Sequence, residues 1–189
     1  MERKTALLLI AEGSEEMEAV ITADVVRRGG VAVTIASVGD TQFVKCSRYV
    51  KILADTTLSK VIEEEKYDAI ILPGGIGGSK TFAESAEVGK LLQEQEKENK
   101  LIAAICAAPT ALKAHGIAKG KQVTSYPAMK DEMSDEYKYL EDNVVVDGNL
   151  ITSRGPATAF DFGLTIVEKL VNKEAAVTVA KGMLYKNYK

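Results

Sequence analysis

The residues best suited to chemistry lie in the run Leu101-Ile-Ala-Ala-Ile-Cys106-Ala-Ala-Pro-Thr110. An apolar stretch rich in β-branched residues ends on Cys106, and Pro109 is typical of the first turn of a helix. The N-terminus of a helix favours a thiolate over a thiol, so we expect the pKa of Cys106 to lie below that of a free cysteine. Small Ala107 and Ala108 permit a sharp turn. The pattern predicts a nucleophile elbow with Cys in place of Ser, the alternative being an unreactive buried cysteine.

Composition narrows the class of protein. The chain has 189 residues, 46% of them hydrophobic and 27% charged, which predicts one globular domain over residues 1–189. A net charge of −3 does not indicate the basic surface that binding to nucleic acid or to an anionic membrane requires. Two cysteines cannot form a disulfide framework and suit a reducing compartment. No apolar stretch reaches the length of a membrane span, so we expect a soluble cytoplasmic protein.

Strand and helix patterns alternate along the chain. Strand-like runs are Thr5–Ala11, Val31–Val38, Val50–Leu53, Tyr67–Leu72, Leu101–Cys106 and Gln122–Ser125, and the runs Val144–Val146 and Leu150–Thr152 read as a hairpin. Helical patterns cover Glu15–Arg28, Leu58–Glu64, Phe82–Glu98, Pro109–His115, Pro156–Val171 and Glu174–Leu184. This order predicts an α/β sandwich of three layers, with a mostly parallel sheet, helices on both faces and one added antiparallel hairpin.

Three segments follow strands at the edge of the sheet where such folds bind ligands: Glu12–Glu18, Pro73–Gly78 and Cys106–Thr110. The glycine-rich segment resembles a phosphate-binding loop, but it lacks the Gly-Lys-Ser/Thr of that loop and has no acidic residue at dinucleotide spacing. Its first two glycines more plausibly bring backbone N–H groups close to the cysteine, as half of an oxyanion hole. A plain tight turn is the alternative.

Three carboxylates fall in the first turn of a predicted helix: Glu15, Glu16 and Glu18. For Glu15 and Glu16, a favourable interaction with the helix dipole is a sufficient interpretation. Glu18 lies beside the apolar Met17 and Val20. It either points inward at the strand ends, where burial would raise its pKa, or stays exposed.

Other polar residues are weaker candidates. His115, the only histidine, ends the helix after the elbow, about 13 Å along the helix from the sulfur, and is expected to interact with the helix C-terminus. Tyr126 follows a candidate strand and is a second residue expected to face the site. Arg28 and Arg48 would line an anion pocket or simply be exposed. Cys46 has no local partner and is treated as a secondary thiol.

Four motifs together point to a known family: Ala11-Glu-Gly-Ser-Glu-Glu-Met-Glu18, Leu72-Pro-Gly-Gly75, Leu101–Leu112 and Thr152-Ser-Arg-Gly-Pro156. In this order and spacing the chain closely resembles the parkinsonism-associated deglycase (DJ-one) family of the ThiJ/PfpI superfamily over essentially its whole length. The resemblance implies a flavodoxin-like sandwich and a homodimer packed partly through the helix at Glu15–Arg28. It implies neither a cofactor nor a metal.

The same resemblance implies a site and an activity. It assigns an oxidant-sensitive nucleophile to Cys106, a protonated carboxyl bonded to it to Glu18, and oxyanion donors to the backbone N–H groups of Gly75 and Ala107. The implied activities are glyoxalase-type conversion of methylglyoxal, deglycation of early protein adducts, and chaperone behaviour under oxidative stress, with cysteine sulfinic acid as the redox switch. By the same resemblance, the nucleus and the mitochondrion are expected locations in addition to the cytoplasm.

Some positions depart from the family pattern. Tyr126 stands where the animal family often has histidine, and tyrosine is mainly a hydrogen-bond donor, so a Cys–His pair is not carried over. Related proteases carry histidine directly after the cysteine, where this chain has Ala107. The glutaminase elbow Gly-x-Cys-x-Gly is also absent, because Ala104 and Ala108 occupy the glycine positions.

Two hypotheses for the function of the chain remain. In one, the Cys106 thiolate attacks a glyoxal or its protein adduct; in the other, Cys106 is a redox sensor without turnover.

Overall fold

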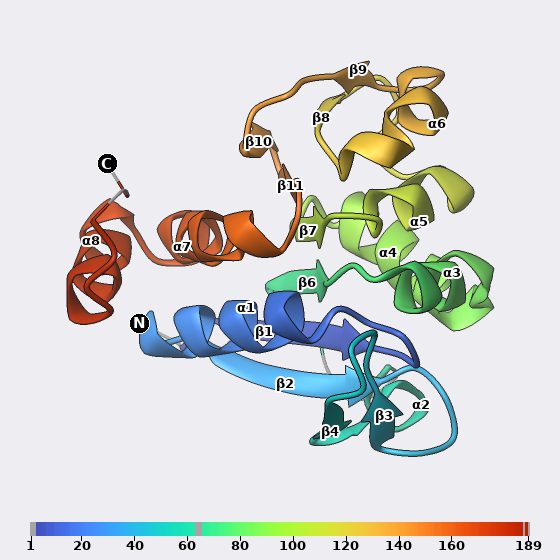
Figure 1. Cartoon of the computed structure of the whole chain (residues 1–189), viewed down its shortest axis with the longest axis horizontal. Helices are drawn as coiled ribbons and strands as arrows, with labels where there is room; N and C mark the ends of the chain where they lie inside the picture. Colours follow the sequence, from blue (N-terminus) through green and yellow to red (C-terminus); the bar gives the residue numbers. More distant parts are fainter. Residues whose placement is uncertain (1–2, 63–65, 187, 189) are drawn as a thin grey trace.

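The computed structural model describes residues 3–62, 66–186 and 188. A seven-stranded sheet with the order β10-β11-β7-β6-β1-β2-β5 forms its centre (Figure 1). These strands are β1 (Thr5–Ile10), β2 (Ala32–Ser37), β5 (Thr56–Thr57), β6 (Ala69–Leu72), β7 (Leu101–Ile105), β10 (Val144–Asp147) and β11 (Leu150–Ser153). All neighbours pair in parallel except β10 and β11, which form an antiparallel hairpin. The predicted α/β class and the added hairpin are confirmed.

Helices cover both faces of this sheet because successive strand residues point to opposite sides. Leu8 and Ile10 pack with one set of helices, whereas Leu7 and Leu9 pack with the other. The first set is α1 (Glu16–Arg28), α7 (Ala159–Leu170) and α8 (Lys173–Gly182). The second is α2 (Leu58–Val61), α3 (Ile76–Glu84), α4 (Ala86–Lys97), α5 (Pro109–Ala114) and α6 (Lys130–Ser134). The structure is therefore the predicted three-layer sandwich.

Helix α1 is held in place by a close crossing with α7. A Cβ atom added to Gly163 would lie 2.9 Å from Cβ of Val25, and one added to Gly29 would lie 2.6 Å from Cγ1 of Val167. Both distances are too short for a side chain, so the two glycines let the helix backbones approach. This crossing positions the first turn of α1, which carries Glu18, against the strand ends.

The helix expected at Phe82–Glu98 is wrong as a single element. The chain breaks at Ser85, which has extended backbone angles (φ −79°, ψ 117°) and accepts a hydrogen bond from the Val88 N–H group at 3.3 Å. Serine often caps a helix in this way. As a result α3 ends before Ser85 and α4 begins after it. Helix α3 also begins earlier than expected, at Ile76, inside the segment expected to be a loop.

Short elements outside the central sheet were expected only in part. The strand expected at Val50–Leu53 is β4 (Lys51–Leu53), which forms a separate hairpin with β3 (Phe43–Lys45). The strand expected at Gln122–Ser125 is β8 (Gln122–Val123), paired with β9 (Lys138–Tyr139). Two 3-10 turns, η1 (Pro127–Met129) and η2 (Pro156–Thr158), were not expected as such.

Residues 63–65, within the helix expected at Leu58–Glu64, lie outside the described residues. Among the helices in the described part of the chain, none has the length and apolar character needed to cross a membrane.

Candidate active site

The cysteine turn between β7 and α5 has the geometry of an elbow. Cys106 has φ 66°, a left-handed conformation that residues other than glycine seldom adopt and that concentrates at functional sites. Its N–H donates to the Ser153 carbonyl at 2.9 Å, and its carbonyl accepts from the Tyr126 N–H at 2.8 Å. The turn is thus fixed from both sides, and the sulfur faces a pocket.

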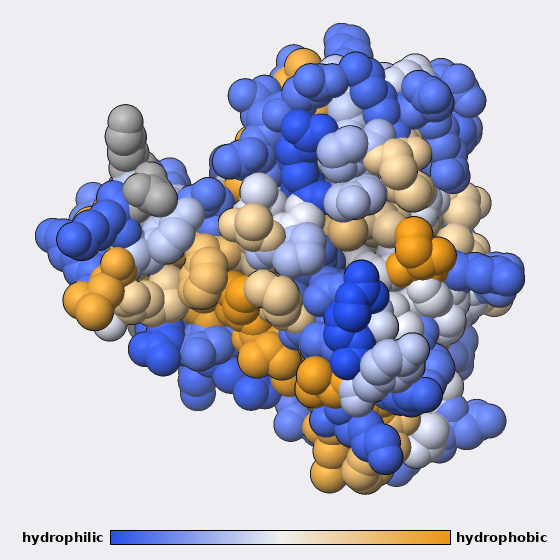
Figure 2. Space-filling view, viewed as in Figure 1, coloured by the Kyte–Doolittle hydropathy of each residue, from blue (hydrophilic) through white to orange (hydrophobic). Residues whose placement is uncertain are grey.

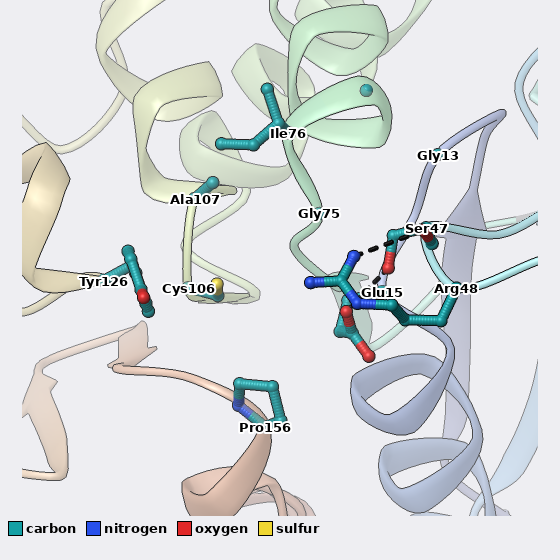
Figure 3. A pocket seen from close by; sticks show the side chains of 11 residues that line it. Gly13, Glu15, Ser47, Arg48, Gly75, Ile76, Cys106, Ala107, Tyr126 and Pro156 are labelled. Carbon is teal, nitrogen blue, oxygen red and sulfur yellow. Dashed lines mark hydrogen bonds between the residues drawn. The ribbon is translucent and has the colours of Figure 1, made fainter.

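That pocket has a volume of about 530 Å³. It lies beyond the carboxyl ends of the strands, where residues from all three predicted segments meet (Figure 3). Its lining consists of Gly13, Glu15, Ser47, Arg48, Gly75, Ile76, Gly77, Cys106, Ala107, Tyr126 and Pro156. Ile76 and Pro156 were not singled out by sequence reasoning, although the segment ending at Pro156 is one of the four family motifs.

Close packing beneath the sulfur requires glycine at position 74. A Cβ atom on Gly74 would lie 2.6 Å from Cβ of Cys106 and 2.7 Å from Oε2 of Glu18. The side chains of Cys106 and Glu18 therefore approach each other over this glycine. The loop after β6 brings together two residues that are far apart in the sequence.

Two backbone N–H groups face the sulfur of Cys106. They belong to Gly75 and Ala107, and each lowers the pKa of the thiol by hydrogen bonding to it. Gly75 has φ 86°, and a Cβ atom there would overlap the carbonyl oxygen of Gly13. Only glycine fits this position. Such paired donors are also the groups that stabilise an oxyanion next to a nucleophile.

Glu18 points inward. It is fully buried, its Oε2 accepts from the Gly74 N–H at 2.7 Å, and its buried Oε1 has no hydrogen-bond partner in the described part of the chain. Burial raises the pKa of Glu18 to about 7, against the lowering effect of hydrogen bonds from Gly74 and the Cys106 side chain. A protonated Glu18 can therefore exist near neutral pH and donate toward the sulfur.

The expectation of a lowered pKa at Cys106 is wrong in direction. Burial and then the negative charge of Glu18 raise the pKa of Cys106 to about 12, outweighing the two backbone donors. The helix α5 that follows has only 6 residues, and its dipole does not compensate for burial. The carboxyl of Glu18 therefore loses its proton before the thiol does, and the resulting carboxylate, beside the sulfur, is a base that can take the proton of Cys106.

Glu15 and Glu16 do more than interact with the helix dipole. The Ser47 hydroxyl donates to Glu15 at 2.7 Å and to Glu16 at 2.9 Å, and the Arg48 N–H donates to Glu16 at 2.8 Å. Burial by itself would raise the pKa of Glu16, but hydrogen bonds from its own backbone, Ser47 and Arg48 lower it. These bonds tie the β3–β4 turn to the start of α1 and place Arg48 at the pocket.

The structure brings only one of the two candidate arginines to the pocket. Arg48 and Tyr126 line it on opposite sides of Cys106 (Figure 3). Arg28 lies at the other end of α1, where it pairs with Asp24 at 2.6 Å, and does not line the pocket. The reason is the length of the helix, which separates its last turn from the strand ends.

The residue before Tyr126 is fixed by contacts that sequence reasoning missed. The Ser125 carbonyl accepts from the Tyr139 hydroxyl at 3.1 Å and from Nε of Arg154 at 3.4 Å. Arg154 belongs to the fourth family motif, which is the signal that would have identified it. His115 is elsewhere, with its Nε2 2.8 Å from the Phe82 carbonyl oxygen, and does not line the pocket.

In the described part of the chain, no cluster of three or more His, Cys, Asp and Glu side chains is arranged to hold a metal ion.

Comparisons with known proteins identify the family of this chain. The model of the DJ-1/PfpI family matches residues 4–169. The chain is 54% identical to protein dj-1beta of Drosophila melanogaster, covering 96% of this chain and 97% of that one. It is 45% identical to glutathione-independent glyoxalase DJR-1.2 of Caenorhabditis elegans, covering 95% of each. The crystal structure of Drosophila melanogaster DJ-1beta superposes with a TM-score of 0.95 at 53% identity, covering 98% of this chain and 100% of that one. The resemblance seen in the four motifs is confirmed: this chain belongs to the DJ-1/PfpI family.

Proposed function

We propose that this chain is a glutathione-independent glyoxalase and deglycase with Cys106 as nucleophile and Glu18 as proton carrier. The observation that carries the proposal is the sulfur in a fixed elbow, facing two backbone N–H groups and a fully buried carboxyl whose Oε1 has no hydrogen-bond partner in the described part of the chain. A relative covering 95% of the chain is named for the glyoxalase reaction.

In the first step the Cys106 thiolate attacks the aldehyde carbon of methylglyoxal. A C–S bond forms, and the carbonyl electron pair moves onto oxygen, where the N–H groups of Gly75 and Ala107 stabilise the charge. The carboxyl of Glu18 donates its proton to this oxygen, giving a hemithioacetal and a carboxylate.

In the second step the carboxylate of Glu18 removes the proton from the former aldehyde carbon and returns a proton to the neighbouring carbon, while the hydroxyl proton on the former aldehyde carbon passes to the oxygen of the neighbouring carbon. This internal transfer oxidises one carbon and reduces the other, so that no external oxidant is needed. The product is a thioester of lactate, and water releases lactate and restores the thiol. A glycated amine enters the same sequence as its hemiaminal: the thiolate forms a C–S bond to the carbon that came from the aldehyde, the C–N bond breaks, and the carboxyl of Glu18 protonates the leaving amine.

The test is lactate formation from methylglyoxal by the purified protein. Wild type and Cys46→Ala should both produce lactate, because Cys46 lies outside the pocket, whereas Cys106→Ala should produce none. Equal rates for Cys106→Ala and wild type would overturn the proposal.

A redox-sensing role is the second candidate for the same residue. Cys106 is partly exposed, and a protonated Glu18 could donate to an oxygen added to the sulfur. Peroxide would oxidise the thiolate first to sulfenic and then to sulfinic acid, each step transferring one oxygen atom to sulfur and releasing water. Both cysteines are free thiols, which suits the reducing cytoplasm.

We also propose that the chain forms a homodimer through α1 and the β3–β4 hairpin. The exposed apolar side chains of these elements are Met17, Val20, Phe43, Val50 and Leu53. Figure 2 shows apolar surface over α1 and the region of the hairpin. A contiguous apolar patch on a surface helix is typical of an interface, and a symmetric dimer is the commonest way to cover one. Sedimentation velocity should give twice the chain mass of 20.3 kDa for wild type and a single chain for Val20→Asp. A monomeric wild type would contradict this assignment.

A further inference from the structure

The pocket has two chemically different sides around the sulfur. Apolar side chains form one side and polar side chains the other: Ile76, Tyr126 and Pro156 against Glu15, Ser47 and Arg48. Figure 3 shows Tyr126 and Arg48 on opposite sides of Cys106, with Ile76 near Ala107. A molecule bonded to the sulfur therefore has apolar side chains on one side and polar side chains on the other.

Ile76 and Tyr126 are large and substantially exposed, at 69% and 46%. Ile76 is the first residue of α3 and has glycine on both sides, so it stands free at the edge of the pocket. Single exposed apolar residues are common on proteins. These two flank the one reactive sulfur of the pocket, where an apolar group bound to it would be removed from water.

A substituted glyoxal, R–CO–CHO, has two distinguishable ends once its aldehyde carbon is bonded to sulfur. With the new oxyanion at the N–H groups of Gly75 and Ala107, the substituent R and the second carbonyl oxygen point in different directions. Placing R on the apolar side buries it, while the carbonyl oxygen then faces the cation of Arg48. The opposite orientation would place R against charged and hydroxyl groups.

We propose that Ile76 and Tyr126 form a recognition wall for the substituent of the substrate, so that this site selects alkyl- and aryl-glyoxals over unsubstituted glyoxal. The proposal rests on the proposed function for turnover, but the wall itself acts on any electrophile that reaches Cys106. Selection comes from the apolar ring of Tyr126 and not from its hydroxyl group.

The deciding experiment measures selectivity without turnover. Phenacyl bromide and bromoacetone each alkylate a thiolate by forming a C–S bond and releasing bromide, and they differ in the phenyl or methyl substituent. Their rates at Cys106, followed by peptide mass spectrometry, are each divided by the rate with N-acetylcysteine. The normalised phenyl-to-methyl ratio should exceed one in wild type and fall by about tenfold in Ile76→Ala/Tyr126→Ala, as is common for lost apolar contacts in a binding site.

Controls separate the wall from other effects. Tyr126→Phe should keep the wild-type ratio, as should Val171→Ala, which truncates an exposed apolar residue that does not line this pocket. A ratio that is unchanged in the double variant would overturn the proposal. In a parallel arm, kcat/KM for phenylglyoxal relative to glyoxal should fall with the same substitutions. A wild type that alkylates selectively but turns over no glyoxal would refute the proposed function while leaving the recognition wall in place.

Discussion

The two thiols of this chain, Cys106 and Cys46, lie in regions that differ in exposure and in the acids beside the sulfur. Cys106 lies in a strained elbow, partly exposed in the pocket. Cys46 lies in the β3–β4 turn, only 3% exposed, where its N–H donates to the Val50 carbonyl at 2.8 Å and its carbonyl accepts from the Tyr49 N–H at 3.0 Å. Burial raises the pKa of both thiols, to about 12 for Cys106 and about 11 for Cys46.

The difference lies in the neighbouring acids. The pKa of Glu18, beside Cys106, is raised to about 7, so near neutral pH its carboxylate can accept the proton of the thiol and its carboxyl can donate one back. Glu16 is one of the acids whose charge acts on Cys46, and its own pKa is lowered. It remains ionised and repels a thiolate. A buried thiol is therefore made reactive by a neighbour that can exchange a proton with it.

The largest expected effect is in oxidation. Graded peroxide should convert Cys106 to sulfinic acid while Cys46 stays reduced, because Cys106 is partly exposed and lies beside a carboxylate that can take its proton, whereas Cys46 is buried. Mass spectrometry of the two cysteine peptides provides the measurement. Parallel oxidation of both thiols would show that the elbow and Glu18 give Cys106 no advantage.

Replacing Glu18 should come next in size. Glu18→Leu removes the proton carrier and should slow lactate formation by about 10²–10⁴-fold, the usual range for general acid–base assistance. Glu18→Gln should slow turnover similarly but still permit sulfinate, because an amide N–H can donate to the oxidised sulfur.

Peroxide titration of the same variants separates these roles, since Glu18→Leu and Glu18→Asp should change how far oxidation proceeds. Glu12→Gln is the matched control, because Glu12 lies in the loop before α1, where its carboxylate accepts from the Lys45 N–H at 3.0 Å, and it is not among the groups that act on Cys106. Unchanged turnover and oxidation in every Glu18 variant would remove Glu18 from the site.

A smaller effect is expected on stability as a function of pH. The pKa of Glu18 is raised from 4.5 to about 7 in the folded protein, so the folded state binds more protons than the unfolded state between these values. The stabilising contribution is complete below pH 4.5 and is lost as pH rises through 7. Glu18→Gln has no such loss. Between pH 4.5 and pH 7 its free energy of unfolding should therefore rise by on the order of 3 kcal/mol relative to that of the wild type. Urea unfolding at pH 4.5 and pH 8 measures the difference, and a gap that stays constant with pH would contradict the burial argument.

Most of the fold could be predicted because its determinants are local. Apolar runs such as Thr5–Ile10 and Leu101–Ile105 are buried on both faces and become central strands, as is typical of parallel sheets. The break at Ser85 could not be separated from a continuous helix, since the pattern of apolar residues continues through it. The extra strand β3 has three residues and depends on pairing with a distant segment.

In the site, too, local features could be predicted from the sequence and features that depend on distant residues could not. The elbow at Cys106 and its neighbour Gly75 follow from residue type and position after a strand. The direction of the Cys106 pKa does not, because it depends on the burial and charge of Glu18, which is 88 residues away in the sequence. Ile76 was overlooked for a similar reason, since an isolated isoleucine among glycines carries no periodic signal.

The smallest expected effect concerns Tyr126, on the side of the pocket opposite Arg48. Its hydroxyl group makes no hydrogen bond among those found for the described residues, and tyrosine is a poor base at neutral pH. Tyr126→Phe should therefore lower methylglyoxal conversion only a few-fold, whereas Cys106→Ala abolishes it. Tyr126→His should raise the rate if the imidazole reaches the sulfur, because histidine exchanges protons near neutral pH. Lactate assays of the three variants decide the matter. If Tyr126→Phe proves as damaging as Cys106→Ala, Tyr126 takes part directly in catalysis and Glu18 is not the sole proton carrier.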